Sequence, residues 1–210
     1  MQTGNAVASQ LTLPGFEATR SMPAHRFFFA VMPDPDTAAR MVDERRRLGP
    51  EVRVSGRPLD AGRLHVTLYS LGDFVHVPQV IVERACFAAA TIDVPPFGVA
   101  FDRILRFNGQ PARRPFVLTG SDGLDGLIMF QRRLLDALRG ARLHLSGTRF
   151  TPHVTLLYGD GTFNRRDIEP IAWTVNEFIL IHSWLGKTHY DVMGRWPLTA
   201  DGQRADDPRS

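Results

Sequence analysis

Apolar residues along this chain fall into short runs of two kinds. Alternating or continuous apolar runs between Gly, Pro and Asp predict strands, and runs with a three- to four-residue period predict helices. Strands are expected over Arg26–Met32, Arg63–Leu71, Phe97–Phe107, Pro115–Thr119, Phe150–Tyr158, Asn176–Leu185 and His189–Trp196. Helices are expected over Pro35–Leu48, Pro78–Thr91 and Leu124–Arg139. The alternation of the two kinds predicts an α+β fold.

The order of these elements repeats within the chain. Phe27 precedes His65 by 38 residues, and Phe116 precedes His153 by 37 residues. Both intervals run strand, helix, long loop and strand, and an apolar strand follows each unit. This pattern predicts a duplicated α+β unit with its two halves related by a pseudo-twofold axis.

Composition sets the domain organisation. Residues 1–24 are rich in Gly, Ser, Thr and Ala and are predicted to form a flexible extension, and residues 200–210 a disordered tail. Residues 25–199 then form a single domain. No run of 18 apolar residues exists, so no membrane span is expected. The single Cys86 excludes an internal disulfide and fits a reducing cytoplasm.

The basic residues are a weaker indication of a phosphate-bearing partner. The net charge is +3, and Lys187 is the sole lysine among 25 basic residues. Arginine forks suit bidentate contact with phosphate. A compositional bias of the genome gives the same count, so the charge permits a nucleic-acid partner without requiring one.

The tripeptide His-Val-Thr occurs twice, each time inside a strand-like run. The copies are His65-Val66-Thr67 and His153-Val154-Thr155. Residues i and i+2 of a strand share a face, so each copy presents an imidazole beside a hydroxyl. A single copy is typical of an ordinary strand surface, but two copies at matching positions of a repeat favour a shared site.

Such a set of side chains suits reactions of a phosphodiester. One histidine can take a proton from the attacking hydroxyl or water, and the other can give a proton to the leaving oxygen. Threonine hydroxyls can donate hydrogen bonds to the phosphoryl oxygens. This chemistry needs no metal, and the sequence has no convincing cluster of metal ligands.

These segments carry a resemblance to a known family. The chain resembles the 2H phosphoesterases, and within them the RNA 2′,3′-cyclic phosphodiesterases, also called 2′-5′ RNA ligases. Phe27–Pro33 is similar to the family's opening strand, His65–Asp73 to its first motif and Phe150–Leu156 to its second. Residues 173–198 look like its closing segment. Ser70 departs from the pattern, because the family more often has Phe there.

The resemblance implies a bilobal α+β fold. Each lobe is an antiparallel sheet with flanking helices and gives one His-X-Thr strand to an active cleft between the lobes. The implied catalytic residues are His65 and His153, with Thr67 and Thr155 holding phosphate. In the family, the second histidine activates water and the first protonates the leaving 3′-oxygen. The residues of this chain leave both assignments open.

The resemblance also implies an activity and its surroundings. The reaction is metal-free opening of a 2′,3′-cyclic phosphate to a 2′-phosphate, with reversible joining of 2′-5′ linkages in RNA. No cofactor is implied. The expected partner is RNA with a cyclic phosphate end or a small cyclic nucleotide, bound by a cytoplasmic monomer.

Four further residues are candidates for substrate contact. Arg63 and Arg149 fall on the histidine faces if the two strands begin that early. Arg114 precedes the Pro115–Thr119 strand, where the family often has Arg. Tyr69 shares the face of His65 by strand counting and could stack on a base, although packing at the edge of the core is the ordinary role of such a residue.

Three functions remain open from the sequence. The first is a metal-independent RNA phosphoesterase that acts on cyclic ends. The second is a phosphodiesterase for 2′-5′ oligonucleotides or small cyclic nucleotides, which a closed pocket would favour over a long basic track. The third is a non-catalytic RNA- or nucleotide-binding module of the same fold. Two proton-transfer groups argue against it, because binding alone does not need them.

Overall fold

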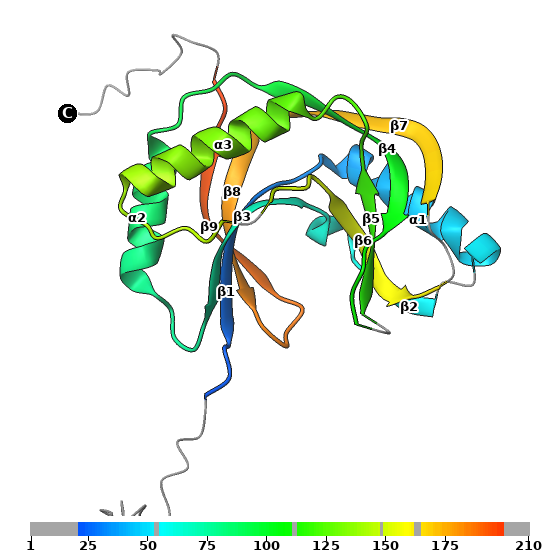
Figure 1. Cartoon of the computed structure of the whole chain (residues 1–210), viewed down its shortest axis with the longest axis horizontal. Coiled ribbons are helices and arrows are strands. Elements are labelled where there is room, and N and C mark those ends of the chain that lie inside the picture. Colours follow the sequence, from blue (N-terminus) through cyan, green and yellow to red (C-terminus); the bar gives the residue numbers. More distant parts are fainter. Residues whose placement is uncertain (1–20, 53–54, 111–112, 148, 162–164, 200–210) are drawn as a thin grey trace, which may run out of the picture.

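The computed structural model describes residues 21–52, 55–110, 113–147, 149–161 and 165–199 (Figure 1). The predicted tail at 200–210 and residues 1–20 of the predicted extension lie outside the described residues. The helices are α1 (Pro35–Val52), α2 (Gln79–Ala90) and α3 (Asp125–Gly140), with a 3₁₀ turn at Ala61–Arg63. The strands are β1 (His25–Val31), β2 (Ser55–Pro58), β3 (Val66–Phe74), β4 (Phe97–Arg106), β5 (Arg114–Thr119), β6 (Val154–Asp160), β7 (Arg165–Val175), β8 (Glu177–Trp184) and β9 (Tyr190–Pro197).

Each helix and strand that the pattern predicted is present, with shifted bounds. The sequence did not predict β2 and β7. Strand β2 spans only four residues. Strand β7 begins with charged residues and contains Pro170, which weakens a strand pattern. Its second half carries the missed signal, because Ile171, Trp173 and Val175 alternate with exposed positions and are buried.

The strands form one antiparallel sheet of two halves. Its order is β7-β4-β5-β6-β3-β1-β8-β9, with β2 paired to β6. Strands β3 and β6 meet only at the pair Val66 and Val154. The sheet is therefore bilobal, with β3, β1, β8 and β9 in one lobe and β2, β6, β5, β4 and β7 in the other. The predicted α+β bilobal class is confirmed.

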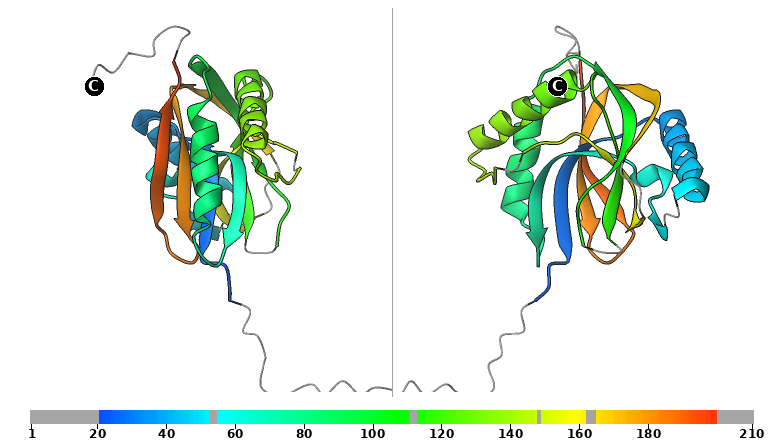
Figure 2. Two further views of the ribbon diagram at one scale, coloured as in Figure 1. Left: turned by 90° about the vertical axis from the view of Figure 1, so that its left-hand side faces the viewer. Right: turned by 45° about the vertical axis from the view of Figure 1, so that its right-hand side comes forward.

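The lobes exchange elements between the two sequence repeats. Strand β8 follows the second repeat but pairs with β1, and β4 follows the first repeat but pairs with β5. Helix α1 packs against β6 and β7, whereas α2 and α3 pack against each other. Figure 2 shows α1 at the opposite end of the molecule from α2 and α3, and buried side chains of all three helices belong to one core. Each lobe therefore contains elements of both repeats.

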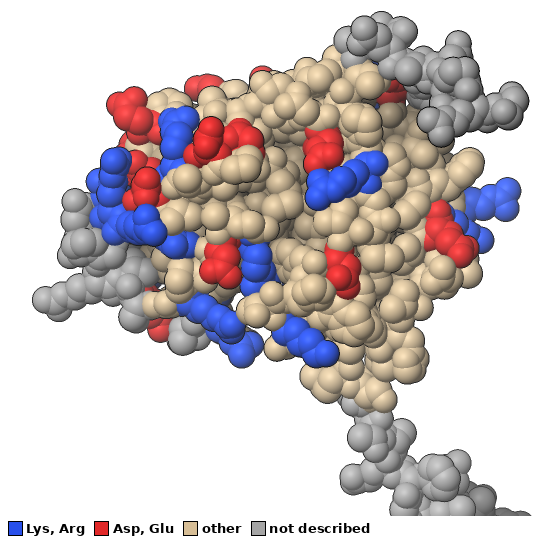
Figure 3. Space-filling view, turned by 180° about the vertical axis from the view of Figure 1, so that it is seen from behind, with Lys and Arg blue, Asp and Glu red and all other residues tan. Residues whose placement is uncertain are grey.

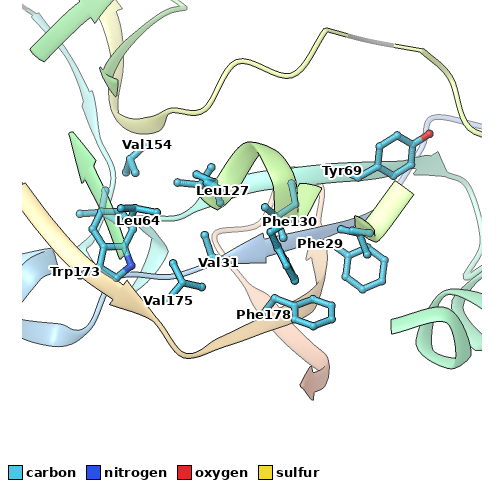
Figure 4. Close-up of a cluster of buried hydrophobic side chains, with 14 of the residues drawn as sticks. Phe29, Val31, Leu64, Tyr69, Leu127, Phe130, Val154, Trp173, Val175 and Phe178 are labelled. Carbon is cyan, nitrogen blue, oxygen red and sulfur yellow. The ribbon is translucent and has the colours of Figure 1, made fainter. Parts of the chain in front are cut away.

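One hydrophobic core runs through both lobes (Figure 4). Phe130 of α3 is 1% exposed and lies between Phe97 of β4 and Phe178 of β8. The ring centroids are 5.5 Å and 5.0 Å away, respectively. Because Phe97 and Phe178 belong to different lobes, α3 holds the two half-sheets together.

Acidic and basic side chains are interspersed on the face of the molecule that Figure 3 shows. Across the described ranges, no helix combines the length and the apolar character needed to cross a membrane.

Candidate active site

The junction of the two half-sheets places both His-Val-Thr motifs together. Val66 and Val154 pair across the junction and are fully buried. Their neighbours in each motif therefore point to the opposite face. His65, Thr67, His153 and Thr155 line one cleft of about 820 Å³. An antiparallel pair has local twofold symmetry, which matches the expected relation between the two motifs.

Each motif strand carries a β-bulge at the leucine after its threonine. Phe29 pairs with Tyr69 while Ala30 pairs with Thr67, which leaves Leu68 as the extra residue. Phe116 pairs with Leu157 while Val117 pairs with Thr155, which leaves Leu156 as the extra residue. The bulges limit the regular face to the motif itself.

Both histidines are oriented by the backbone in the same way. His65 Nδ1–H donates to the carbonyl of Arg63 at 2.7 Å, and His153 Nδ1–H donates to the carbonyl of Thr151 at 2.7 Å. These bonds fix the tautomer when the rings are neutral. Proton exchange with a ligand then falls to Nε2 of each ring.

Aromatic rings support both imidazoles. Phe28 of β1 stacks on His65 with ring centroids 5.0 Å apart, and Phe107 lies 5.1 Å from His153. Tyr190 of β9 meets His65 edge-on at 6.0 Å. Rings packed on one side of an imidazole restrict its rotation, so both histidines are held toward the cleft.

The two histidines differ in electrostatic environment. Burial is the main cause that lowers the pKa of His65 from 6.5 to about 4, and the nearby His153 and Arg63 lower it further. The hydrogen bond to the Arg63 carbonyl opposes these effects. His65 is therefore neutral at pH 7 in the unliganded protein, with Nε2 able to accept a proton.

The His65 ring is expected to titrate with a pKa of about 4 when followed by NMR. His153→Ala should raise that pKa, because the charge on His153 contributes to lowering it. Between pH 6.5 and about 4 the unfolded chain binds a proton that folded His65 does not. The contribution of His65 to the free energy of unfolding therefore decreases as the pH falls through this range. A pKa near 6.5 in the wild-type protein would contradict the description of this site.

Basic side chains line the rest of the cleft. Arg63 lies at the 3₁₀ turn, with its guanidinium carbon 4.4 Å from the centroid of the Tyr190 ring. Its Nε is buried and has no hydrogen-bond partner within the described part of the chain. Arg26, Arg57 and Lys187 also line the cleft. Arg26 is bound by Asp73, with contacts of 2.6 and 2.7 Å. These cations favour an anionic ligand.

Strand counting placed Arg63 and Arg149 on the histidine faces, and the structure places them differently. Arg63 reaches the cleft from the 3₁₀ turn rather than from the strand, because β3 begins only at Val66. Strand β6 begins at Val154, so the strand face does not extend back to Arg149. Arg149 instead lines a neighbouring pocket together with Thr67 and His153. Arg114 lies outside the lining of both and contacts Asp160 at 3.5 Å.

Tyr69 belongs to the core rather than to the histidine face. The bulge at Leu68 rotates Tyr69 onto the side of Phe29, and its side chain is 8% exposed. Figure 4 shows its ring at the edge of the buried cluster, with its hydroxyl pointing away from the other side chains. The hydroxyl accepts a hydrogen bond from the backbone N–H of Ser146 at 3.0 Å.

Several cleft residues were missed from the sequence. Phe28, Tyr190 and the β8–β9 turn line the cleft only because β1 and β8 pair across the repeats. No local pattern marks them, apart from the alternation of Phe28 with two core phenylalanines. Within the described ranges, no group of three or more His, Cys, Asp or Glu side chains could hold a metal ion.

The comparisons with known proteins agree with this geometry. The family model described as the 2′-5′ RNA ligase superfamily matches residues 33–184. The chain belongs to this superfamily. Its match begins just after β1 and includes both His-Val-Thr motifs. A comparison with the curated proteins found no match.

Solved structures share the fold over most of the chain. LigT of E. coli in complex with 3′-AMP is 25% identical with a TM-score of 0.69, over 85% of this chain and 100% of LigT. The same protein in complex with phosphate gives 27% identity and a TM-score of 0.62 over the same shares. TT0787 of Thermus thermophilus has a TM-score of 0.64 and is 20% identical, over 84% of this chain and 99% of TT0787. At this identity the match supports the fold alone.

Proposed function

We propose that this protein opens the terminal 2′,3′-cyclic phosphate of RNA to a 2′-phosphate, without a metal ion. The observation that carries this proposal is the convergence of two imidazoles and two threonine hydroxyls on one cationic cleft. A binding module needs the cations but not two proton-transfer groups. E. coli LigT, a relative with this fold, binds phosphate and 3′-AMP, which supports a nucleotide ligand.

The reaction needs one proton acceptor and one proton donor. Water attacks phosphorus, its proton passes to one imidazole, the bond from phosphorus to the 3′-oxygen breaks, and the other imidazole protonates that oxygen. Thr67 and Thr155 donate hydrogen bonds to the equatorial oxygens. The lowered pKa of His65 favours His65 as the acceptor and His153 as the donor. This assignment is the reverse of the one that the family resemblance implies.

The same chemistry can act on a 2′-5′ linkage. A nucleoside hydroxyl in place of water would form such a linkage, and the reverse step would cleave it. The second candidate substrate is therefore a small cyclic nucleotide or a 2′-5′ oligonucleotide. The complex of LigT with 3′-AMP, a single nucleotide, supports this candidate. The single Cys86 supports our placing of this activity in the cytoplasm, and we propose that the active form is a monomer.

The deciding experiment assays the wild-type protein in EDTA with two substrates, a nucleoside 2′,3′-cyclic phosphate and a short RNA with a cyclic end. Formation of a 2′-phosphate from either compound is expected, and faster opening of the RNA would identify RNA as the preferred substrate. A 3′-phosphate product, or loss of the activity in EDTA, would contradict the proposed mechanism. A lack of turnover of both compounds would favour the binding module.

Each threonine is expected to contribute less than a histidine. Thr67→Ala and Thr155→Ala should each lower kcat/KM by about 10- to 100-fold, because a hydrogen bond to a charged oxygen contributes about 1.5–3 kcal/mol. Steady-state kinetics on the cyclic phosphate measure this loss. Thr67→Ser and Thr155→Ser keep the hydroxyl and should retain most of the activity. Equal losses in the Ala and Ser variants would assign the threonines a packing role instead.

A further inference from the structure

The outer edges of the two motif strands differ. Strand β6 pairs with β5 on one edge, and on the other β2 pairs with residues Leu157–Asp160. Strand β3 pairs with β1 on one edge. On its other edge, no strand within the described ranges pairs with β3 beyond Val66. The pseudo-twofold symmetry is therefore broken beside the catalytic side chains.

A cavity of about 510 Å³ lies along this uncovered edge, and we call it the β3-edge pocket. Its lining is formed by residues Thr67–Gly72, Phe107, Gln131, Ser146, Arg149, Phe150, Thr151 and His153. Thr67 and His153 also line the main cleft. The two spaces therefore meet at Thr67, which is proposed to hold the phosphate, and at His153, which is proposed to protonate the leaving oxygen. A ligand whose phosphate lies there has room on either side.

The lining of the β3-edge pocket suits a flat neutral group with polar edges. Phe107 offers an aromatic ring beside His153. Gln131 is 6% exposed, and among the described residues its amide has one hydrogen bond, a long one of 3.5 Å to the Leu68 carbonyl. An amide side chain has two donors and an acceptor with two lone pairs, so most of its capacity is open to a ligand. Among the described residues of this lining, Arg149 is the one Arg or Lys.

The main cleft has the opposite character. Arg57, Arg63 and Lys187 line it and fit the phosphates of an RNA chain, while Arg26 is paired with Asp73. The volume of the β3-edge pocket falls at the lower end of the range for small-molecule sites, about 300–1,000 Å³. Cationic side chains are therefore concentrated in the main cleft rather than in the β3-edge pocket.

We propose that the β3-edge pocket is a nucleobase subsite, which takes the base of the nucleotide whose phosphate reacts. The base stacks on Phe107 and its polar edge meets the Gln131 amide. This inference rests on the proposed function for the position of the phosphate. It explains why the β3 edge is open where the equivalent β6 edge is covered.

The test compares two substrates that differ only in the base. They are adenosine 2′,3′-cyclic phosphate and the 2′,3′-cyclic phosphate of methyl riboside. Wild type is expected to prefer adenosine by about 5- to 100-fold in kcat/KM, the range that stacking of one base contributes. Ser146→Trp places a bulky ring in the pocket and keeps the backbone N–H that binds Tyr69. In this variant the ratio of kcat/KM for the adenosine substrate to kcat/KM for the methyl riboside substrate should fall toward one.

A second variant tests the competing location of the base. Tyr190→Ala removes an aromatic ring from the main cleft and should leave the preference for adenosine in place. Loss of the preference in Tyr190→Ala but not in Ser146→Trp would overturn the subsite and place the base in the main cleft. Equal rates on the two substrates in wild type would also overturn it, while the proposed function would stand.

Binding separates failure of the subsite from failure of the proposed function. If neither of these substrates nor the short RNA with a cyclic end is turned over, the proposed function fails, and calorimetric titration with adenosine 2′-phosphate and methyl riboside 2′-phosphate decides the subsite. Tighter binding of the adenosine compound to wild type than to Ser146→Trp would support the subsite on its own. Equal affinities of the two compounds would overturn it.

Discussion

His65→Ala and His153→Ala are each expected to lower kcat on a nucleoside 2′,3′-cyclic phosphate by about 10²–10⁴-fold. Each change removes one of the two groups that move protons, and its partner cannot serve both as acceptor and as donor in one step. The measurement is initial-rate kinetics at saturating substrate, with circular dichroism to show that the fold is kept. His76→Ala is the matched control, because His76 is exposed and lies outside the cleft lining.

The roles of the two histidines can be separated by the leaving group. A 4-nitrophenyl ester of a 3′-deoxynucleoside 2′-phosphate places a phenolate in the position of the leaving 3′-oxygen, and this phenolate leaves without needing a proton from an acid. With His65 as acceptor and His153 as donor, His153→Ala should regain activity on this ester and His65→Ala should not. Rescue of His65→Ala instead would restore the assignment that the family resemblance implies. Full activity of both variants on the cyclic phosphate would contradict paired-histidine catalysis.

Phe130→Ala is expected to lower the free energy of unfolding by about 3–5 kcal/mol. Phe130 is 1% exposed, and its ring packs on Phe97 of one lobe and Phe178 of the other. Its removal leaves a cavity at the point where the half-sheets share one core. Urea unfolding followed by tryptophan fluorescence and by circular dichroism measures the change. Because each lobe contains strands of both repeats, the two signals should report a single transition.

The same substitution at an exposed phenylalanine is the control. Phe87 of α2 is 72% exposed, so Phe87→Ala should change the free energy of unfolding by no more than about 0.5 kcal/mol. Two separate transitions in wild type would show that the lobes unfold independently and would contradict the shared core. A loss below about 1 kcal/mol in Phe130→Ala would contradict tight packing at that site.

The sequence predicted those features whose information is local. The helices and the seven predicted strands follow from apolar periods within each segment, and α1 begins where Asp34 accepts hydrogen bonds from Thr37 at 2.8 and 2.7 Å. The His-Val-Thr chemistry was visible because two-residue spacing on a strand places both side chains on one face. The repeat indicated that the two copies belong together, and the α+β bilobal class followed with the family resemblance.

Tertiary structure decided everything that depends on pairing between distant segments. The exchange of β4 and β8 between the lobes has no local pattern, because strand partners are chosen by burial across the whole sheet. The bulges at Leu68 and Leu156 appear only against the partner strands, and one of them moves Tyr69 into the core. The depressed pKa of His65 follows from burial, and the open edge of β3 from the lack of a pairing strand beyond Val66 in the described residues. The sequence thus determined which side chains carry the chemistry, whereas burial and strand pairing, which are nonlocal, determined their surroundings.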